Sequence, residues 1–277
     1  AVVTSLHNPR LRAAAALRER RARTREGRFL VDGTREIGRA LDAGFAVLEA
    51  FVEPVAVAAD PARAQLVEHL RAQGVAIVTV GPEALGKVAF GDRSEGIVAV
   101  VAAPHDIEDL EGLGAALPAD PLMVVLEGLE KPGNVGAVLR SADGAGVSAV
   151  ILADPVADPW NPNTIRASLG TVFSLPLRIG SSGAVRTWLA DRGLRIVAAR
   201  VDGATDYDAV DLTGPTAIVL GSEAQGLTDA WSGEGIEAVR LPMLGRADSL
   251  NVSATAAVLC YEASRQRRLS RSRPGRT

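Results

Sequence analysis

The sequence predicts an α/β protein of two domains. Its 277 residues leave room for two domains of about 100 to 150 residues each. Apolar residues make up 47% of the chain but aromatic residues only 4%, so the cores must be built from Ala, Val, Leu and Ile. That composition suits buried parallel strands flanked by helices. Short apolar runs also alternate with helical patterns along most of the chain.

The first hundred residues predict a small α/β sandwich. An Ala- and Arg-rich stretch predicts a helix at 8–24. Apolar runs predict four strands, at 29–33, 47–53, 75–80 and 96–101. Helical patterns predict three more helices, at 34–43, where Gly44 ends the helix, at 61–71 and at 82–88.

A stretch at 103–120 that contains Pro, Gly and Asp interrupts this pattern. We therefore expect a linker at 105–119 between domains at 1–104 and 120–267. Five apolar runs follow the linker, at 121–126, 149–153, 194–199, 216–221 and 238–243. Helical segments separate most of these runs, which predicts a parallel sheet with right-handed crossovers. We expect the basic tail at 268–277 to be disordered.

Charge is distributed unevenly along the chain. Residues 1–28 carry a net charge of +6 and residues 265–277 another +6, while the whole chain carries −3. The body at 29–264 is therefore strongly acidic. Basic ends on an acidic body favour a polyanionic partner, because a phosphate backbone attracts such ends through counterion release. The alternative is a solvated helix face and a frayed tail. Only Lys87 and Lys131 are lysines among the 30 basic residues.

Composition argues against several other classes of protein. A single cysteine, Cys260, excludes an internal disulfide, and three scattered histidines have no metal-ligand spacing. We therefore expect no metal. No apolar run approaches the ~20 residues of a membrane span, and no signal-peptide pattern opens the chain. We expect a soluble, cytoplasmic protein with no membrane partner.

The first polar loop that could carry chemistry follows the predicted strand at 121–126. Asn134 suits the N-cap of the next helix. Gly136 and Arg140 lie four residues apart on one helix face, and the Arg140 side chain should lean back over the bare glycine. The alternative is an ordinary exposed arginine beside a packing glycine.

Two further polar loops follow predicted strands of the same sheet. The loop "GSEAQGL" at 221–227 has glycines that allow close backbone approach to a ligand, and it offers the acid Glu223. The third loop lies within residues 241–266, and its Ser249 or Asn251 would serve as the N-cap of the helix that follows. Carboxyl ends of parallel strands meet at one edge of a sheet. The three loops therefore predict a site for group transfer, in which positioning and polarisation do most of the work.

The combination of these loops resembles the SpoU/TrmH branch of the SPOUT RNA methyltransferases. The family's three motifs are matched in order by "PGNVGAVLR" (132–140), "GSEAQGL" (221–227) and "LPMLGRADSLNVSATAAVLCYE" (241–262). The resemblance covers residues 120–267. The first hundred residues also resemble a substrate-binding domain of ribosomal-protein type. Departures are small: Ala224 stands where Gly is common, and Glu127 and Glu130 stand where Asp is frequent.

The resemblance implies methylation of a ribose 2′-hydroxyl with S-adenosylmethionine as cofactor. By the same likeness Arg140 is the main catalytic residue, and the polar site is completed by Asn134, Glu223, Ser249 and Asn251. A guanidinium gives up its proton reluctantly, so orientation and charge stabilisation are the minimum role of Arg140. Cofactor contacts carry over to Gly221, Ser222, Gly226, Leu241 and Leu250.

The resemblance also implies a SPOUT domain with a deep trefoil knot, an RNA-binding N-terminal domain and a homodimer. The expected RNA is 23S rRNA. Some family members methylate it to confer resistance to antibiotics of the thiostrepton and avilamycin types, and the layout of this chain is compatible with that group.

Three alternatives stay open on the sequence alone. A tRNA ribose methyltransferase is disfavoured by the N-terminal domain. A non-catalytic RNA-binding protein would leave Arg140, Glu223 and Asn251 without a purpose. A nucleotide-dependent α/β enzyme of another kind lacks support, because the chain has neither a phosphate-loop lysine nor dinucleotide-binding glycines.

Overall fold

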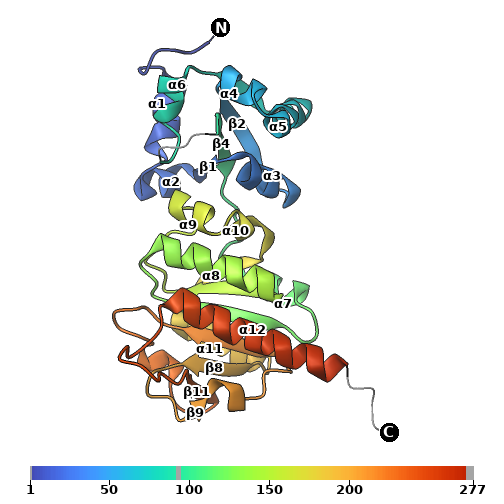
Figure 1. The fold of residues 1–277 in the computed structure, drawn as a ribbon, viewed down its shortest axis with the longest axis vertical. Coiled ribbons are helices and arrows are strands. Elements are labelled where there is room, and N and C mark those ends of the chain that lie inside the picture. The colour runs from blue at the N-terminus through green and yellow to red at the C-terminus, as the bar shows by residue number, and fades with distance from the viewer. Residues whose placement is uncertain (1, 92–94, 273–277) are drawn as a thin grey trace. The chain divides into compact units, whose positions relative to one another are not determined.

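The computed structural model describes residues 2–91 and 95–272, and it divides into two compact units (Figure 1). The first unit comprises the described residues up to His105 together with Asp158–Ser174. The second comprises Asp106–Ala157 and the described residues from Leu175 onward. The division at 105/106 lies beside the expected linker. The segment 158–174, which we expected in the C-terminal domain, is grouped with the first unit.

The first unit is built on a mixed four-stranded sheet. Its strand order is β1 (Arg28–Asp32), β4 (Ile97–Ala102), β2 (Val47–Val52) and β3 (Ala76–Thr79). Strand β4 runs antiparallel to β1 and β2, whereas β2 and β3 are parallel. The helices of this unit are α1 (Pro9–Ala16), α2 (Arg20–Glu26), α3 (Thr34–Asp42), α4 (Pro54–Ala58), α5 (Pro61–Ala72), α6 (Pro82–Gly86), α9 (Pro162–Ala167) and α10 (Thr171–Ser174).

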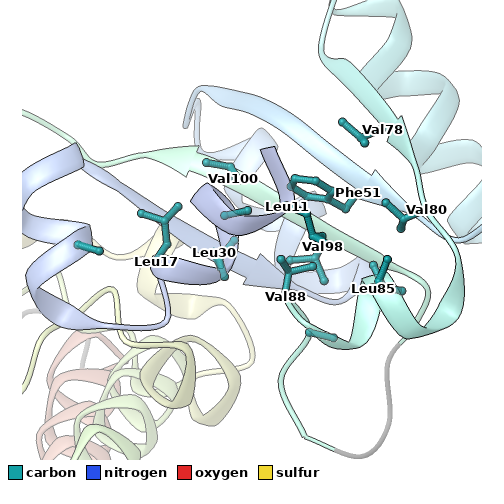
Figure 2. Close-up of a cluster of buried hydrophobic side chains, with 14 residues drawn as sticks. Leu11, Leu17, Leu30, Phe51, Val78, Val80, Leu85, Val88, Val98 and Val100 are labelled. Carbon is teal, nitrogen blue, oxygen red and sulfur yellow. The ribbon is translucent and has the colours of Figure 1, made fainter. Parts of the chain in front are cut away.

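One core of the first unit lies between its sheet and the N-terminal helices. Figure 2 shows Leu11 and Leu17 of the first helical stretch packed near Leu30 and Phe51 of the sheet. All four side chains are at most 3% exposed. The basic N-terminal stretch is therefore a folded part of the domain and not a loose arm.

The expected single helix at 8–24 is wrong, because the chain breaks between α1 and α2. The break places the side chain of Arg23, which is only 4% exposed, where it can be hydrogen-bonded. Its Nη1 donates to the carbonyl oxygens of Leu17 at 2.9 Å and Arg18 at 2.7 Å, and its Nε donates to Asp158 at 2.6 Å. A buried guanidinium needs such acceptors, and a continuous helix would have engaged those carbonyls itself.

Aromatic side chains join the segment 158–174 to the rest of the first unit. The ring of Phe29 in β1 stacks on Trp160 with centroids 4.8 Å apart and on Phe173 at 6.0 Å. Phe45 meets Trp160 and Phe173 edge-on. Since the sequence holds only five Phe and three Trp, this cluster concentrates a large share of its aromatic surface at one place.

The second unit contains the predicted parallel sheet, with seven strands. Their order is β7 (Leu177–Gly180), β6 (Ala149–Ala153), β5 (Leu122–Glu127), β10 (Thr216–Leu220), β8 (Arg195–Ala199), β11 (Ile236–Arg240) and β9 (Thr205–Asp206). Every neighbouring pair is parallel. The five predicted runs form the centre of the sheet, and the two unpredicted strands, β7 and β9, form its edges.

Helices cover this sheet. They are α7 (Leu110–Ala116), α8 (Pro132–Ala145), α11 (Ser182–Asp191) and α12 (Val252–Arg271), with short 3-10 turns at Tyr207–Ala209 and Asp229–Trp231. Residues from α7 and α11 share one core with the strands, and α8 packs along α12 (Figure 1). The expected linker at 105–119 therefore contains a helix. Asp109 caps α7 through the Gly112 N–H, and Leu113 is buried in the core.

The expected disorder at 268–277 is wrong for its first residues, because α12 continues to Arg271. Arg267 anchors this part of the helix. Its guanidinium donates to the carbonyl oxygens of Leu212 at 2.9 Å and Asp120 at 2.8 Å, and also to those of Pro121 and Gly214. Residues 273–277 lie outside the described residues. Across the described chain, no helix has the length and apolar character needed to span a membrane.

Candidate functional site

A cavity of about 940 Å³ opens at the carboxyl ends of β8, β10 and β11. Because these strands are parallel and adjacent, the loops that follow them meet at one edge of the sheet. Most of the residues expected to form the site line this cavity: Gly221, Ser222, Glu223, Gly226, Leu241, Ser249, Leu250 and Asn251. The cavity also has a wall that was not predicted, which is the loop that follows β8.

Gly221 makes the shape of the middle loop possible. A Cβ at this position would lie 2.2 Å from the carbonyl carbon of Gly226, 2.3 Å from its oxygen and 2.5 Å from the backbone nitrogen of Leu227. Gly226 has a φ of +67°, and its N–H donates to the backbone carbonyl oxygen of Ser222 at 2.9 Å. The loop therefore folds back on itself so tightly that only a glycine fits at 221.

Glu223 connects all three predicted loops. Its Oε1 accepts hydrogen bonds from Nδ2 of Asn134, at 2.8 Å, and from Nδ2 of Asn251. Its Oε2 contacts the ammonium group of Lys131. The hydrogen bond and charge of Lys131 hold the pKa of Glu223 below its ordinary value, and the two amides act in the same direction. Glu223 is therefore held as a carboxylate with partners on both oxygens.

The helix caps differ in part from the expectation. Asn134 is not the N-cap of α8. The helix begins earlier, at Pro132, because proline suits the first helical position. Asn134 thus lies in the first turn, and its side chain is free to reach Glu223. Asn251 does cap α12: its Oδ1 accepts from the Ser253 N–H at 2.8 Å, while its Nδ2 faces Glu223.

Arg140 stands apart from this network. It lies on α8, six residues beyond Asn134 and so about 9 Å further along the helix axis. Its side chain is exposed and has no hydrogen bond or ion pair within the described chain, whereas Gly136 on the same face is buried. Contacts therefore bring Asn134, Glu223 and Asn251 together. Arg140 remains an unpaired cation on the same helix as Asn134.

Glu127 is a buried carboxylate that holds the 221–227 loop in place. It ends β5 and is only 3% exposed. One carboxylate oxygen accepts the Thr228 N–H at 2.8 Å, and the other accepts the hydroxyls of Thr228 at 2.7 Å and Ser182 at 2.6 Å. Glu127, which stands where Asp is frequent in the family, therefore links the end of the 221–227 loop to the start of α11.

Two features of the site were missed by sequence reasoning. One is Lys131, whose only signal was that it is one of two lysines. The other is the wall that follows β8, where two ion pairs line the cavity: Asp202 with Arg200 at 3.0 Å and Asp206 with Arg240 at 2.8 Å. Among the described residues, no cluster of His, Cys, Asp and Glu could hold a metal ion.

A large cavity with a few convergent polar groups at the carboxyl edge of a parallel sheet defines an α/β enzyme site. Residues 121–261, just over half of the chain, match the model of the SpoU rRNA Methylase family. Residues 8–99 match an MRM3-like substrate binding domain. The chain therefore belongs to the SpoU rRNA methylase family.

Individual relatives are similar to this protein over nearly the whole length of the chain. A 23S rRNA (uridine(2479)-2′-O)-methyltransferase from Streptomyces viridochromogenes is 36% identical, covering 91% of this chain and 88% of the relative. The crystal structure of an RNA 2′-O ribose methyltransferase is 40% identical, with a TM-score of 0.83, covering 96% of this chain and 99% of that one. The SpoU methyltransferase AviRb from S. viridochromogenes, solved with AdoMet, is 32% identical, with a TM-score of 0.84, covering 94% and 98%.

Proposed function

We propose that this protein methylates a ribose 2′-hydroxyl of 23S rRNA with S-adenosylmethionine as the methyl donor. The observation that carries the proposal is the Glu223 network, which gathers polar groups from three loops beside a large cavity. The named activity of the S. viridochromogenes relative supports the choice of RNA.

The residues around the cavity fit this cofactor. A volume of about 940 Å³ lies at the upper end of the range for small-molecule sites. Leu241 and Leu250 offer an apolar wall, and the bare Gly221 and Gly226 offer close backbone approach. The carboxylate of Asp248, which lines the cavity and has no ion pair among the described residues, suits a ligand that carries ammonium and sulfonium charges.

When bound, the cofactor supplies a methyl group on a positively charged sulfur, which makes the carbon electrophilic. The side chains of this chain then orient the ribose hydroxyl and stabilise charge on its oxygen as its proton departs. Arg140, an unpaired cation on α8, is assigned that electrostatic role. Ser249 and Asn251, which line the cavity, are assigned to orienting the ribose.

The first unit is assigned to binding the rRNA. Three arginines are exposed and make no hydrogen bond or ion pair within the described part of the chain: Arg12, Arg21 and Arg28. Their charges are therefore available to phosphates. Other arginines of this stretch are already engaged: Arg10 pairs with Glu49, and Arg23 is buried against Asp158. The RNA-binding surface is therefore narrower than the count of arginines suggests.

Several finer properties belong to the same proposal. The likeness to the family implies a homodimer and a trefoil knot, and a ribosomal substrate implies the cytoplasm. Light scattering at micromolar concentration tests the dimer. Resistance to a ribosome-targeting antibiotic is tested by comparing inhibition of methylated and unmethylated ribosomes. A tRNA substrate is the alternative, and the first unit disfavours it.

The decisive experiment is transfer of a labelled methyl group to total rRNA and to tRNA, followed by mapping of the modified nucleotide. Label on a 23S rRNA ribose is expected. Label on tRNA alone would replace the proposal with its alternative, and no label on either RNA would refute it.

The catalytic assignment has its own test. Arg140→Ala should lower turnover by about 100-fold or more, as expected when a group that stabilises the transition state is removed. Cofactor affinity measured by calorimetry should stay within about twofold, since Arg140 does not line the cavity. Wild-type turnover in this variant would remove Arg140 from the mechanism.

A further inference from the structure

Lys131 lies in the polar network of the site, although the family resemblance gives it no role. It occupies the N-cap position of α8, directly before Pro132. Its ammonium group contacts one oxygen of Glu223, while the two asparagine amides donate to the other oxygen. The carboxylate thus has a different kind of partner on each side.

This arrangement fixes the orientation of both asparagine side chains. An amide can be turned by 180°, and the hydrogen bonds around it decide which end faces which partner. With Nδ2 facing Glu223, the Oδ1 of Asn251 accepts from the Ser253 N–H and hydroxyl. The Oδ1 of Asn134 receives no hydrogen bond from the residues that the structure describes. It is therefore an acceptor that remains available to a ligand.

The contribution of Lys131 to stability is expected to be small. Its side chain is 71% exposed and that of Glu223 is 28% exposed, and ion pairs in such surroundings add little to folding. Geometry is the larger effect. Without Lys131, no other group among the described residues holds Oε2 of Glu223, so the carboxylate can rotate and release one of the two amides.

We propose that Lys131 is a positioning residue for methyl transfer. By holding Glu223, it keeps the Asn134 amide turned so that its Oδ1 accepts a hydrogen bond from the target ribose hydroxyl. A hydroxyl that donates to a fixed acceptor presents its oxygen lone pair in a defined direction, which favours attack on the methyl group. Asn134 only accepts this hydrogen bond and takes no proton. As the oxygen–methyl bond forms, the sulfur–methyl bond of the cofactor breaks, S-adenosylhomocysteine leaves, and the hydroxyl proton passes to solvent water. The inference rests on the proposed function and adds a residue to it.

The test compares Lys131→Ala, Lys131→Arg, Glu223→Gln and the double variant Lys131→Ala/Glu223→Gln in steady-state methylation of rRNA. Lys131→Ala should lower kcat by about tenfold, while the KM for cofactor and for RNA change less than about twofold. Lys131→Arg should recover most of the loss, because a guanidinium can also hold the carboxylate. The double variant should be no slower than Glu223→Gln, because Lys131 acts through Glu223.

Arg195→Ala is the matched control, since it breaks an exposed ion pair with Glu237 at the amino end of β8, away from the carboxyl ends of the strands where the cavity opens. It should retain wild-type kcat. All variants should keep the wild-type melting temperature, which separates positioning from loss of fold.

Three outcomes would overturn the inference. Lys131→Ala with wild-type kcat would show that Glu223 needs no such support. Additive losses in the double variant would show that Lys131 acts independently of Glu223. Weaker RNA binding with a salt dependence reduced by about one phosphate contact, at unchanged kcat, would make Lys131 a phosphate ligand instead. In each of these cases the wild-type enzyme still methylates RNA, so the proposed function stands. A wild-type protein that transfers no methyl group to RNA would overturn both.

Discussion

Gly221→Ala should disrupt the cofactor site by displacing its central loop. The added Cβ would lie 2.2 to 2.5 Å from three backbone atoms of Gly226 and Leu227, whereas ordinary contacts begin near 3.4 Å. The backbone must therefore move by more than about 1 Å, and displacements of that size at a positioned site can cost about 100-fold in rate. Overpacking of this kind also costs about 1 to 3 kcal/mol of stability.

Calorimetric titration of S-adenosylmethionine into the variant should show at least a tenfold weaker affinity, equivalent to about 1.4 kcal/mol. The Thr228 end of the loop is held by Glu127, so the displacement should be concentrated near Gly226. Gly183→Ala is the matched control, because its Cβ would meet no atom within 4 Å and it lies in helix α11. Wild-type cofactor affinity in Gly221→Ala would refute the assignment of this loop to the cofactor.

Three further predictions concern the first unit. Trp160→Ala should destabilise it by about 3 to 5 kcal/mol in denaturant unfolding, because Trp160 stacks on Phe29; a loss below about 1 kcal/mol would contradict this. Burial raises the pKa of Asp32 from 3.8 to about 6, so the folded state binds that proton more tightly and loses stability as pH rises from about 4 through 6. Asp32→Asn should therefore be more stable than the wild type at pH 8, by up to about 3 kcal/mol, with the difference vanishing below pH 4; equal stability at both pH values would count against it. Arg21→Ala should reduce the slope of log affinity for rRNA against log salt by about 0.7 to 0.9 without changing the melting temperature, and an unchanged slope would exclude Arg21 as a phosphate contact.

The central strands of the second unit could be predicted because burial on both faces leaves a continuous apolar run. Strand β5 is buried at all six positions and β10 at all five. The edge strands lack this signal. Strand β7 has four residues, only one of them fully buried, and β9 has two, both polar. Their pairing depends on neighbours that are distant in sequence, and no local pattern encodes that.

The site was predictable to the extent that its chemistry follows strand ends. The loops with Glu223 and Asn251 were found because each follows an apolar run, and the structure joins them by a hydrogen bond. The residues alone predicted Asn134 only as a helix cap, and its place in the polar site was expected from the family resemblance. Lys131 was not predicted, because its position beside Glu223 depends on where α8 begins. Asn134 was predicted as the N-cap of this helix, but α8 already begins at Pro132. Asn134 therefore lies in the first helical turn, where its side chain faces the site. The catalytic and cofactor roles of the individual residues, like the knot and the dimer, stay predictions.

The packing of residues 158–174 bears on how the two domains can be separated. The family model for the substrate-binding domain ends at residue 99, yet the aromatic core of the first unit needs Trp160 and Phe173, and buried Arg23 needs Asp158. A fragment that ends at His105 would expose Phe29 to water and leave a buried guanidinium without its carboxylate, which is among the costlier losses in a protein interior. The first unit, to which we assign RNA binding, therefore depends on a segment that lies within the SpoU methylase match at 121–261. An exchange of N-terminal domains between relatives should preserve folding only when this segment is exchanged with them.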